Sequence, residues 1–133
     1  MTDVDNPSEN PYADEARERW GNTEAYRQST ERTSRYTAED WAEIKAAGAD
    51  LNERLAAALR AGVAATDPAA MDLAEEHRRQ LDRWFYDCGP DFHRNLGDMY
   101  VADPRFTATY DAVTPGLATY LRDAIHANAD RTA

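Results

Sequence analysis

Residues 37–62, TAEDWAEIKAAGADLNERLAAALRAG, decide the fold class because they contain the signals of one long amphipathic helix. Thr37 and Asp40 have the spacing of a capping box, with Asp in place of the usual Glu, and Gly62 is the residue type that often ends a helix. Between them, apolar or small residues recur every three or four positions, as on one stripe of a helix. That stripe comprises Trp41, Ile44, Gly48, Leu51, Leu55 and Ala58. We expect a helix over 38–61.

Similar start signals recur further along the chain. Three sites place a capping residue directly before a proline: Asp67-Pro68, Asp103-Pro104 and Thr114-Pro115. A proline is well suited to the first helical position. No segment alternates apolar and polar residues with the period of two that is typical of strands, so the sequence predicts an all-α fold. Gly89-Pro90 separates two of the expected helices, which cover 68–87, 91–101, 104–112 and 115–129.

The apolar residues divide the chain into an arm and a body. Of the 17 Leu, Ile, Val and Phe residues, residues 1–40 contain only Val4. We therefore predict a polar N-terminal arm over 1–36 and a helical body over 37–133. Two short helices are expected in the arm, and isolated helices of this length are marginal in water. They cover about 11–20 and 23–34.

The charge and the single cysteine exclude several classes of protein. The chain has 25 Asp and Glu against 15 Lys and Arg, a net charge of -10. Such a chain repels nucleic acid and anionic membranes, so neither is expected as a direct partner. We find no membrane-spanning apolar run and no signal peptide. The only cysteine, Cys88, excludes an internal disulfide and fits a reducing compartment, so we expect a cytoplasmic protein.

Two histidines occupy apolar stripes of the expected helices. His77 shares its stripe with Ala74, Leu81 and Trp84. It is interpreted either as a core histidine hydrogen-bonded to a neighbour or as a polar contact in a ligand pocket. Catalysis would require a partner base or nucleophile at reachable spacing, and the sequence shows none.

The second histidine, His93, lies in line with Gly97 and Tyr100 and beside Met99. A glycine inside a helix suggests the close approach of another helix or of a ligand. The same interpretation applies to Gly48.

Cys88 has three possible roles: nucleophile, metal ligand or small buried hydrophobe. Its expected position at a helix C-terminus, directly after Asp87, favours the thiol over the thiolate. With His77 and His93 it would offer at most three metal ligands, at a spacing that matches no familiar zinc pattern. A buried cysteine, without metal or other cofactor, is the prediction.

The aromatic residues are the strongest functional signal, because three Trp and seven Tyr accompany only three Phe. Large rings with polar tips suit a half-wet cleft around an aromatic guest. The alternative is that they fill a core poor in aliphatic side chains. The residues concerned are Trp20, Tyr26, Tyr36, Trp41, Trp84, Tyr86, Tyr100, Tyr110 and Tyr120.

Several sequence blocks resemble the TipAS antibiotic-recognition domain. They include ERWGNTEAY at 18–26, YTAEDW at 36–41 and WFYDC at 84–88. Further similar blocks lie within 93–100, 103–107 and 115–125, so the resemblance covers about 12–129.

The resemblance implies a globin-like all-α fold without haem that binds thiopeptide antibiotics, which are apolar macrocycles built from azole rings. The family often forms the C-terminal effector domain of MerR-type activators of drug resistance. Because the chain begins at Met1 without a DNA-binding segment ahead of the arm, we expect a non-enzymatic drug-binding domain that sequesters antibiotic. One alternative is the effector-sensing part of a longer MerR-type regulator. A haem or metal protein, with His77 and His93 as ligands, is another.

The expected binding set combines the aromatic residues with their polar neighbours. The resemblance further implies that the arm becomes ordered over the ligand. Some family members capture a dehydroalanine through a cysteine seven residues after the position of Cys88, where this chain has Asn95, so binding is expected to be reversible. The complete set is Trp20, Tyr26, Tyr36, Trp41, His77, Trp84, Tyr86, Asp87, Cys88, His93, Asn95, Met99 and Tyr100.

Overall fold

The computed structural model describes residues 23–132, and in that part of the chain all regular structure is helical. The expected all-α class is therefore confirmed. The expected helix over 11–20 and the candidate Trp20 lie outside the described residues. The helices are α2 (Glu24–Thr33), α3 (Ala38–Arg60), α4 (Pro68–Trp84), α5 (Pro90–Ala102), α6 (Pro104–Asp111) and α7 (Leu117–Arg131).

The start signals of α3, α4 and α6 act as the sequence indicates. Thr37 Oγ1 accepts a hydrogen bond from the Asp40 backbone N–H at 3.1 Å, and Asp40 Oδ2 accepts one from the Thr37 N–H at 3.0 Å, so the capping box is complete. Asp67 and Asp103 cap α4 and α6 through their side chains. Gly62 follows α3 with φ of 79°, a conformation that glycine adopts without strain.

Helix α4 ends three residues before the predicted boundary of 87. The backbone N–H groups of Phe85 and Tyr86 both donate to Leu81 O, at 2.9 and 3.1 Å, and the helical path stops there. The Cys88 N–H then donates to Asp82 Oδ1 at 2.9 Å, which holds the following residues as a loop. Tyr86, Asp87 and Cys88 therefore lie in the α4–α5 loop and not on a helix.

Helix α7 begins at Leu117, so the prediction of a start at Pro115 was wrong. The Thr114 side chain accepts from Arg60 Nε at 3.3 Å and does not cap the helix. Gly116 has φ of 87° and the Leu117 N–H donates to Thr114 O, so Pro115 and Gly116 form a turn before the helix.

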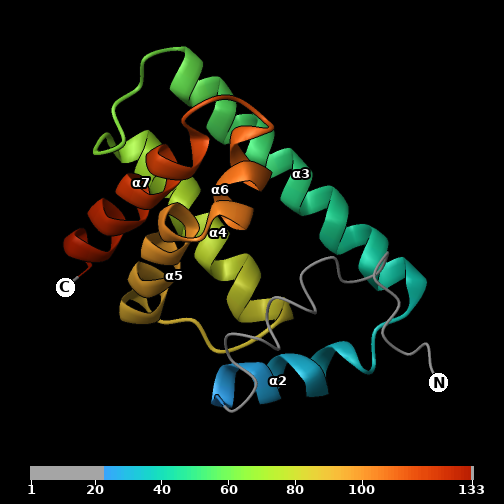
Figure 1. Ribbon diagram of the computed structural model, residues 1–133. Coiled ribbons are helices and arrows are strands. Elements are labelled where there is room, and N and C mark those ends of the chain that lie inside the picture. The colour runs from blue at the N-terminus through green and yellow to red at the C-terminus, as the bar shows by residue number, and fades with distance from the viewer. Residues whose placement is uncertain (1–22, 133) are drawn as a thin grey trace.

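The core is organised around α7, which contacts α3, α4, α5 and α6 (Figure 1). Gly97 allows α5 to approach α7 closely, because a Cβ at position 97 would lie 3.4 Å from Ile125 Cδ1 and 3.5 Å from Arg122 Cα. For Gly48 the expected close approach is absent within the described residues, since a Cβ there would meet nothing within 4 Å. The largest fully buried aliphatic side chains are Leu51, Leu55, Leu117, Leu121 and Ile125.

Figure 1 shows α3 running along one side of the body and α2 lying across its end, near the α4–α5 loop. Within the described residues, no helix is both long and apolar enough to cross a membrane.

Candidate functional site

The interior of the body contains a pair of directly hydrogen-bonded histidines. His77 on α4 and His93 on α5 are 7% and 1% exposed, and 2.9 Å separates His77 Nδ1 from His93 Nε2. On the other side of His77, Tyr110 Oη lies 3.4 Å from Nε2. The sequence placed both histidines on inner stripes, and the structure brings them together.

Both histidines are neutral at physiological pH. Burial lowers the pKa of His77 to about 4. Burial, followed by the proximity of His77 and Arg78, lowers the pKa of His93 to about 2. A desolvated imidazole loses the hydration that stabilises its charged form, so it remains unprotonated.

Aromatic rings surround this pair. The Tyr100 ring meets His77 edge to face at a centroid distance of 5.9 Å and contacts Tyr110 at 5.0 Å and Phe106 at 5.6 Å. The Tyr86 ring meets Phe92 edge to face at 5.3 Å. Burial raises the pKa of Tyr86 and of Tyr100, so both remain phenols. The interior thus combines large apolar faces with several uncharged polar atoms.

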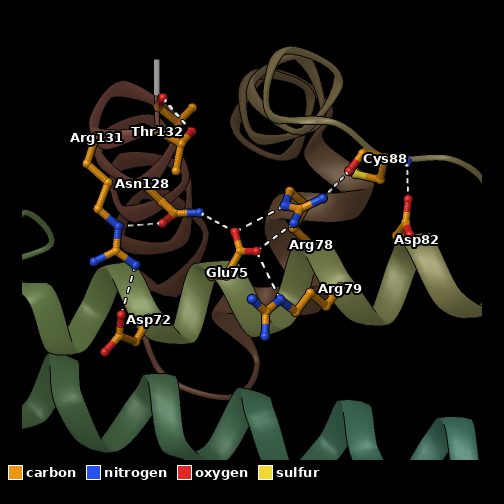
Figure 2. Close-up of polar contacts among 10 residues, drawn as sticks. Asp72, Glu75, Arg78, Arg79, Asp82, Cys88, Asn128, Arg131 and Thr132 are labelled. Atoms are coloured by element: carbon orange, nitrogen blue, oxygen red, sulfur yellow. Dashed lines mark hydrogen bonds and ion pairs between the residues drawn. The ribbon is translucent and has the colours of Figure 1, made fainter.

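Cys88 is a buried thiol, 1% exposed. Burial, and not a helix C-terminus as expected, is the main cause that raises its pKa to about 12. Its backbone is held on both sides, because the carbonyl oxygen accepts from Arg78 Nη1 at 2.7 Å and the N–H donates to Asp82 (Figure 2). Because it stays protonated, this sulfur is a poor nucleophile.

A half-buried carboxylate, Glu75, connects α4, α7 and the α4–α5 loop (Figure 2). Glu75 Oε1 accepts from Arg78 Nε at 3.0 Å and from Asn128 Nδ2 at 2.9 Å, and Oε2 accepts from Arg79 Nε at 3.0 Å. The hydrogen bond from Arg78 is the largest cause that lowers the pKa of Glu75 to about 2. Glu75 therefore fixes Arg78, which in turn holds the carbonyl of Cys88.

A second aromatic group lies where α2 meets the body. The Tyr36 ring meets Trp84 and Trp41 edge to face at 5.5 and 5.8 Å, and Trp41 also contacts Phe85. Tyr36 Oη donates to Trp84 O at 2.6 Å. The Arg83 guanidinium lies 4.7 Å from the centroid of the Trp84 ring, a cation–π arrangement.

Helix α2 is attached to the loop mainly through polar side chains. Gln28 exchanges two hydrogen bonds with Asp87, and Arg32 Nη2 donates to Asp87 Oδ1 at 2.8 Å. Arg32 Nη1 also donates to Asp82 O at 2.7 Å. No residue of α2 is fully buried, so these contacts, together with Tyr36, fix its position.

The predicted site residues thus fall into two neighbouring groups and a remainder. Tyr26 is half-buried on α2, Met99 packs partly buried against the core, and Asn95 is exposed on α5. The interior group contains His77, Tyr86, Cys88, His93 and Tyr100. The group at α2 contains Tyr36, Trp41, Trp84 and Asp87.

Sequence reasoning missed the residues that hold these groups in place. Gln28 and Arg32 are four apart in an expected helix, a spacing that puts them on one face and was a usable signal. No sequence signal connected Arg78 to Cys88, because the contact depends on where α4 ends.

Metal binding has little basis in this part of the molecule. Among residues 23–132, no group of three or more His, Cys, Asp and Glu side chains could hold a metal ion. His77 and His93 use one nitrogen each in their mutual hydrogen bond.

A separate open hollow lies beside α7 and contains none of the predicted site residues. Its polar lining carries both charge signs and is accessible to water. The lining comprises Ala65, Thr66, Arg122, Asp123, His126, Ala127 and Asp130.

Comparison with known proteins shows extensive similarity. The family model of the TipAS antibiotic-recognition domain matches residues 12–128. The HTH-type transcriptional activator TipA of Streptomyces coelicolor is 54% identical over 120 residues, which make up 90% of this chain and 47% of that protein. The chain spans about half the length of the curated relatives that it matches.

Two solved structures are also similar. One is the structure of nosiheptide in complex with TipAS, from a thiopeptide antibiotic multidrug resistance system of Streptomyces lividans. The two chains are 52% identical, their TM-score is 0.86, and the match covers 96% of this chain and 87% of that chain. The other is the antibiotic binding domain of a TipA-class multidrug resistance transcriptional regulator, at 49% identity and a TM-score of 0.63, covering 68% of this chain and 96% of that chain. The expected globin-like helical fold is thereby confirmed.

Proposed function

The chain belongs to the TipAS antibiotic-recognition domain family, and we propose that it binds bulky, largely uncharged peptide antibiotics of the thiopeptide class without transforming them chemically. The observation that carries this proposal is the match, over nearly the whole chain, to a structure in complex with nosiheptide. An interior of uncharged aromatic and polar groups supports it, because such surfaces suit heteroaromatic macrocycles.

The proposed binding surface joins the two groups of residues on either side of the α4–α5 loop. Trp84 and Tyr36 provide aromatic rings near α2, and the buried Tyr100 and His93 provide polar atoms from the interior. Asp87 connects them, since it lies in the loop and holds α2. A macrocycle inserted between α2 and the body would contact both groups.

Binding is proposed to be reversible. Asn95 is exposed on α5 and its amide does not add to an alkene, while the Cys88 thiol is buried with a pKa raised to about 12. Neither side chain provides the thiolate that attack on a dehydroalanine requires.

The arm over 1–36 is proposed to become ordered over the ligand. In α2, the one arm helix within the described residues, no residue is fully buried. Ordering the backbone costs roughly 1–2 kcal/mol per residue. A bound apolar macrocycle would supply surface worth about 25 cal/mol per Å² buried, which offsets that cost.

A second candidate function is effector sensing within a MerR-type activator. The observation that favours it is that the curated relatives are transcriptional activators about twice the length of this chain. Both functions use the same binding event and differ only in what is joined to this domain.

Titration with nosiheptide, followed by tryptophan fluorescence and calorimetry, tests the proposal. Trp41 and Trp84 lie at the proposed surface, so binding should change their emission and saturate at one ligand per chain. A highly charged peptide antibiotic serves as the negative control. Recovered nosiheptide of unchanged mass is expected, whereas absence of saturable binding would refute the proposed function.

A further inference from the structure

The two buried imidazoles meet edge to edge and not face to face. Their ring planes are only 22° apart, yet their centroids are 5.2 Å apart. The centroid distance exceeds the 2.9 Å between His77 Nδ1 and His93 Nε2 by about two imidazole ring radii, as it does when both nitrogens lie on the line that joins the two ring centres. The contact is therefore an in-plane hydrogen bond, with one proton between the two nitrogens.

That shared proton couples the tautomers of the two rings. Each neutral imidazole has one N–H and one bare nitrogen. If His77 Nδ1 carries the shared proton, His93 Nε2 is bare and His93 must be protonated on Nδ1. If His93 Nε2 carries it, His77 must be protonated on Nε2. Both rings are consequently Nδ1–H, or both are Nε2–H.

Tyr110 selects between these two states. Its hydroxyl lies 3.4 Å from His77 Nε2, a long hydrogen bond, and it also has a hydrogen bond with the Tyr100 hydroxyl. Tyr100 can donate to Tyr110, and Tyr110 can then donate to a bare His77 Nε2. This direction uses each phenol as a donor, and it requires the Nδ1–H form of both histidines.

The last nitrogen of this chain of hydrogen bonds, His93 Nδ1, has no hydrogen-bond partner among the described residues. The His93 side chain is 99% buried, given its 1% exposure. The charged groups near it are Arg78, which disfavours its protonation, and Glu75, which favours it less strongly. A buried N–H without a partner is destabilising until an acceptor arrives.

We propose that His77 and His93 are both Nδ1–H tautomers and that His93 Nδ1–H is a specificity-determining donor to an acceptor of the bound antibiotic, an azole nitrogen or amide carbonyl. This inference rests on the proposed function for its ligand. Tyr110 acts as a positioning residue, because it fixes the tautomer without itself meeting that acceptor.

The tautomers are measured on the free, 15N-labelled protein from two-bond 15N–1H correlations of the histidine rings. Both rings are expected to show a protonated Nδ1 and a bare Nε2. Opposite tautomers, two Nε2–H rings or an imidazolium at pH 7 would overturn the proposal. This measurement needs no antibiotic, so it is independent of whether the proposed function is correct.

Tyr110→Phe removes the phenol that donates to His77, so the Nε2–H form of both rings should become populated. Tyr120→Phe is the matched control, because that buried tyrosine donates to Val63 O, at 2.8 Å, elsewhere in the body. An unchanged tautomer in Tyr110→Phe would show that Tyr110 does not select it.

The donor itself is tested with nosiheptide and two substitutions at one position. The amide nitrogen of an Asn side chain can occupy the position of His93 Nδ1, whereas that of a Gln side chain can occupy the position of His93 Nε2. His93→Asn therefore keeps an N–H donor at the Nδ1 position, and His93→Gln removes it. With folding verified by circular dichroism, His93→Gln should bind nosiheptide about tenfold more weakly than His93→Asn, the value of one hydrogen bond.

The wild-type His93 Nδ1–H resonance should also shift when nosiheptide binds. Binding with an unchanged resonance and equal affinities for the two variants would overturn the donor role and leave the proposed function intact. Complete absence of nosiheptide binding would refute the proposed function and the donor role together, while the tautomer result would stand.

Discussion

Gln28 and Asp87 form a closed pair of hydrogen bonds across 59 positions of sequence. Gln28 Nε2 donates to Asp87 Oδ2 at 3.2 Å, and the Asp87 backbone N–H donates to Gln28 Oε1 at 2.8 Å. A single side chain of α2 thus recognises both the carboxylate and the backbone of the α4–α5 loop. The attachment of α2 therefore depends on the shape of that loop.

Asp87→Ala should loosen α2 while the body stays folded. The substitution removes the acceptors for Gln28 and Arg32 but leaves the backbone contact. Because Asp87 is exposed, the loss of global stability should be below about 1 kcal/mol. Hydrogen exchange should show faster amides over 24–33 only. Asp91→Ala is the control, since that carboxylate is almost fully exposed and lies 3.7 Å from Arg94. Unchanged exchange in Asp87→Ala would contradict this role.

Acidification should destabilise the protein through the histidine pair. The pKa of a histidine is about 6.5 in the unfolded chain, whereas it is about 4 for His77 and about 2 for His93 in the fold. The unfolded state therefore binds more protons below about pH 6.5, and stability falls as the pH drops toward 4 and 2. Between pH 7 and 5 we expect a loss of roughly 2–4 kcal/mol, measured by urea unfolding. His93→Gln should reduce this pH dependence, and an unchanged pH dependence in that variant would contradict the role of the pair.

Glu75→Ala should destabilise the fold more than Glu76→Ala, its neighbour in sequence. Glu75 is half-buried, and its removal takes away the acceptor of Arg78 Nε and of Asn128 Nδ2, a loss of about 1–3 kcal/mol. Glu76 pairs with Arg54 in a more exposed position, and such pairs contribute about 0–1 kcal/mol. Chemical denaturation of both variants measures the difference in the free energy of unfolding. Equal losses would show that the Glu75 contacts stabilise the fold no more than the Glu76–Arg54 pair does.

Covalent capture should be absent in the wild type and obtainable by one substitution. Intact mass spectrometry after incubation with nosiheptide should show only the free protein, because the Cys88 thiol is buried and protonated. Asn95→Cys places an exposed thiol on α5, at the position where the family resemblance implies a capturing cysteine, and should form an adduct. An adduct on Cys88 would contradict the reversible mode.

Trp84→Ala should weaken antibiotic binding by a factor of about 5–150, which corresponds to the roughly 1–3 kcal/mol that an aromatic side chain contributes by stacking on a heteroaromatic ring. Calorimetry measures the affinity, and Tyr36→Phe is an informative companion because it keeps the ring beside Trp84 and removes only the hydrogen bond to Trp84 O. A folded Trp84→Ala protein that binds like the wild type would place the binding surface elsewhere.

Local signals predicted most of the fold, and long-range contacts explain the errors. The Thr37 capping box and the Asp-Pro starts depend on residues a few positions apart, so they can be identified from the sequence. Thr114 looked like another cap, but its side chain instead accepts from Arg60, 54 positions earlier. A local pattern cannot show which distant side chain will compete for a hydroxyl.

In the candidate site, too, the features set by local sequence were predictable and those set by long-range contacts were not. Helical periodicity correctly placed His77 and His93 on buried faces, because burial follows from the stripe on which a residue lies. Their mutual hydrogen bond depends on how α4 and α5 pack, and that packing is set by contacts with α7. The loop position of Cys88 was missed for a related reason, since α4 ends earlier than its sequence suggests.

The central position of α7 has a consequence for biosynthesis. The residues of α7 supply the middle of the core, yet they leave the ribosome only after those of α3, α4, α5 and α6. Until then α3, α4 and α5 have no common partner, and their apolar stripes remain exposed to other chains and to chaperones. We expect the nascent chain to stay incompletely packed until α7 emerges, so a stop codon before Leu117 should yield aggregated or degraded protein instead of a smaller folded domain.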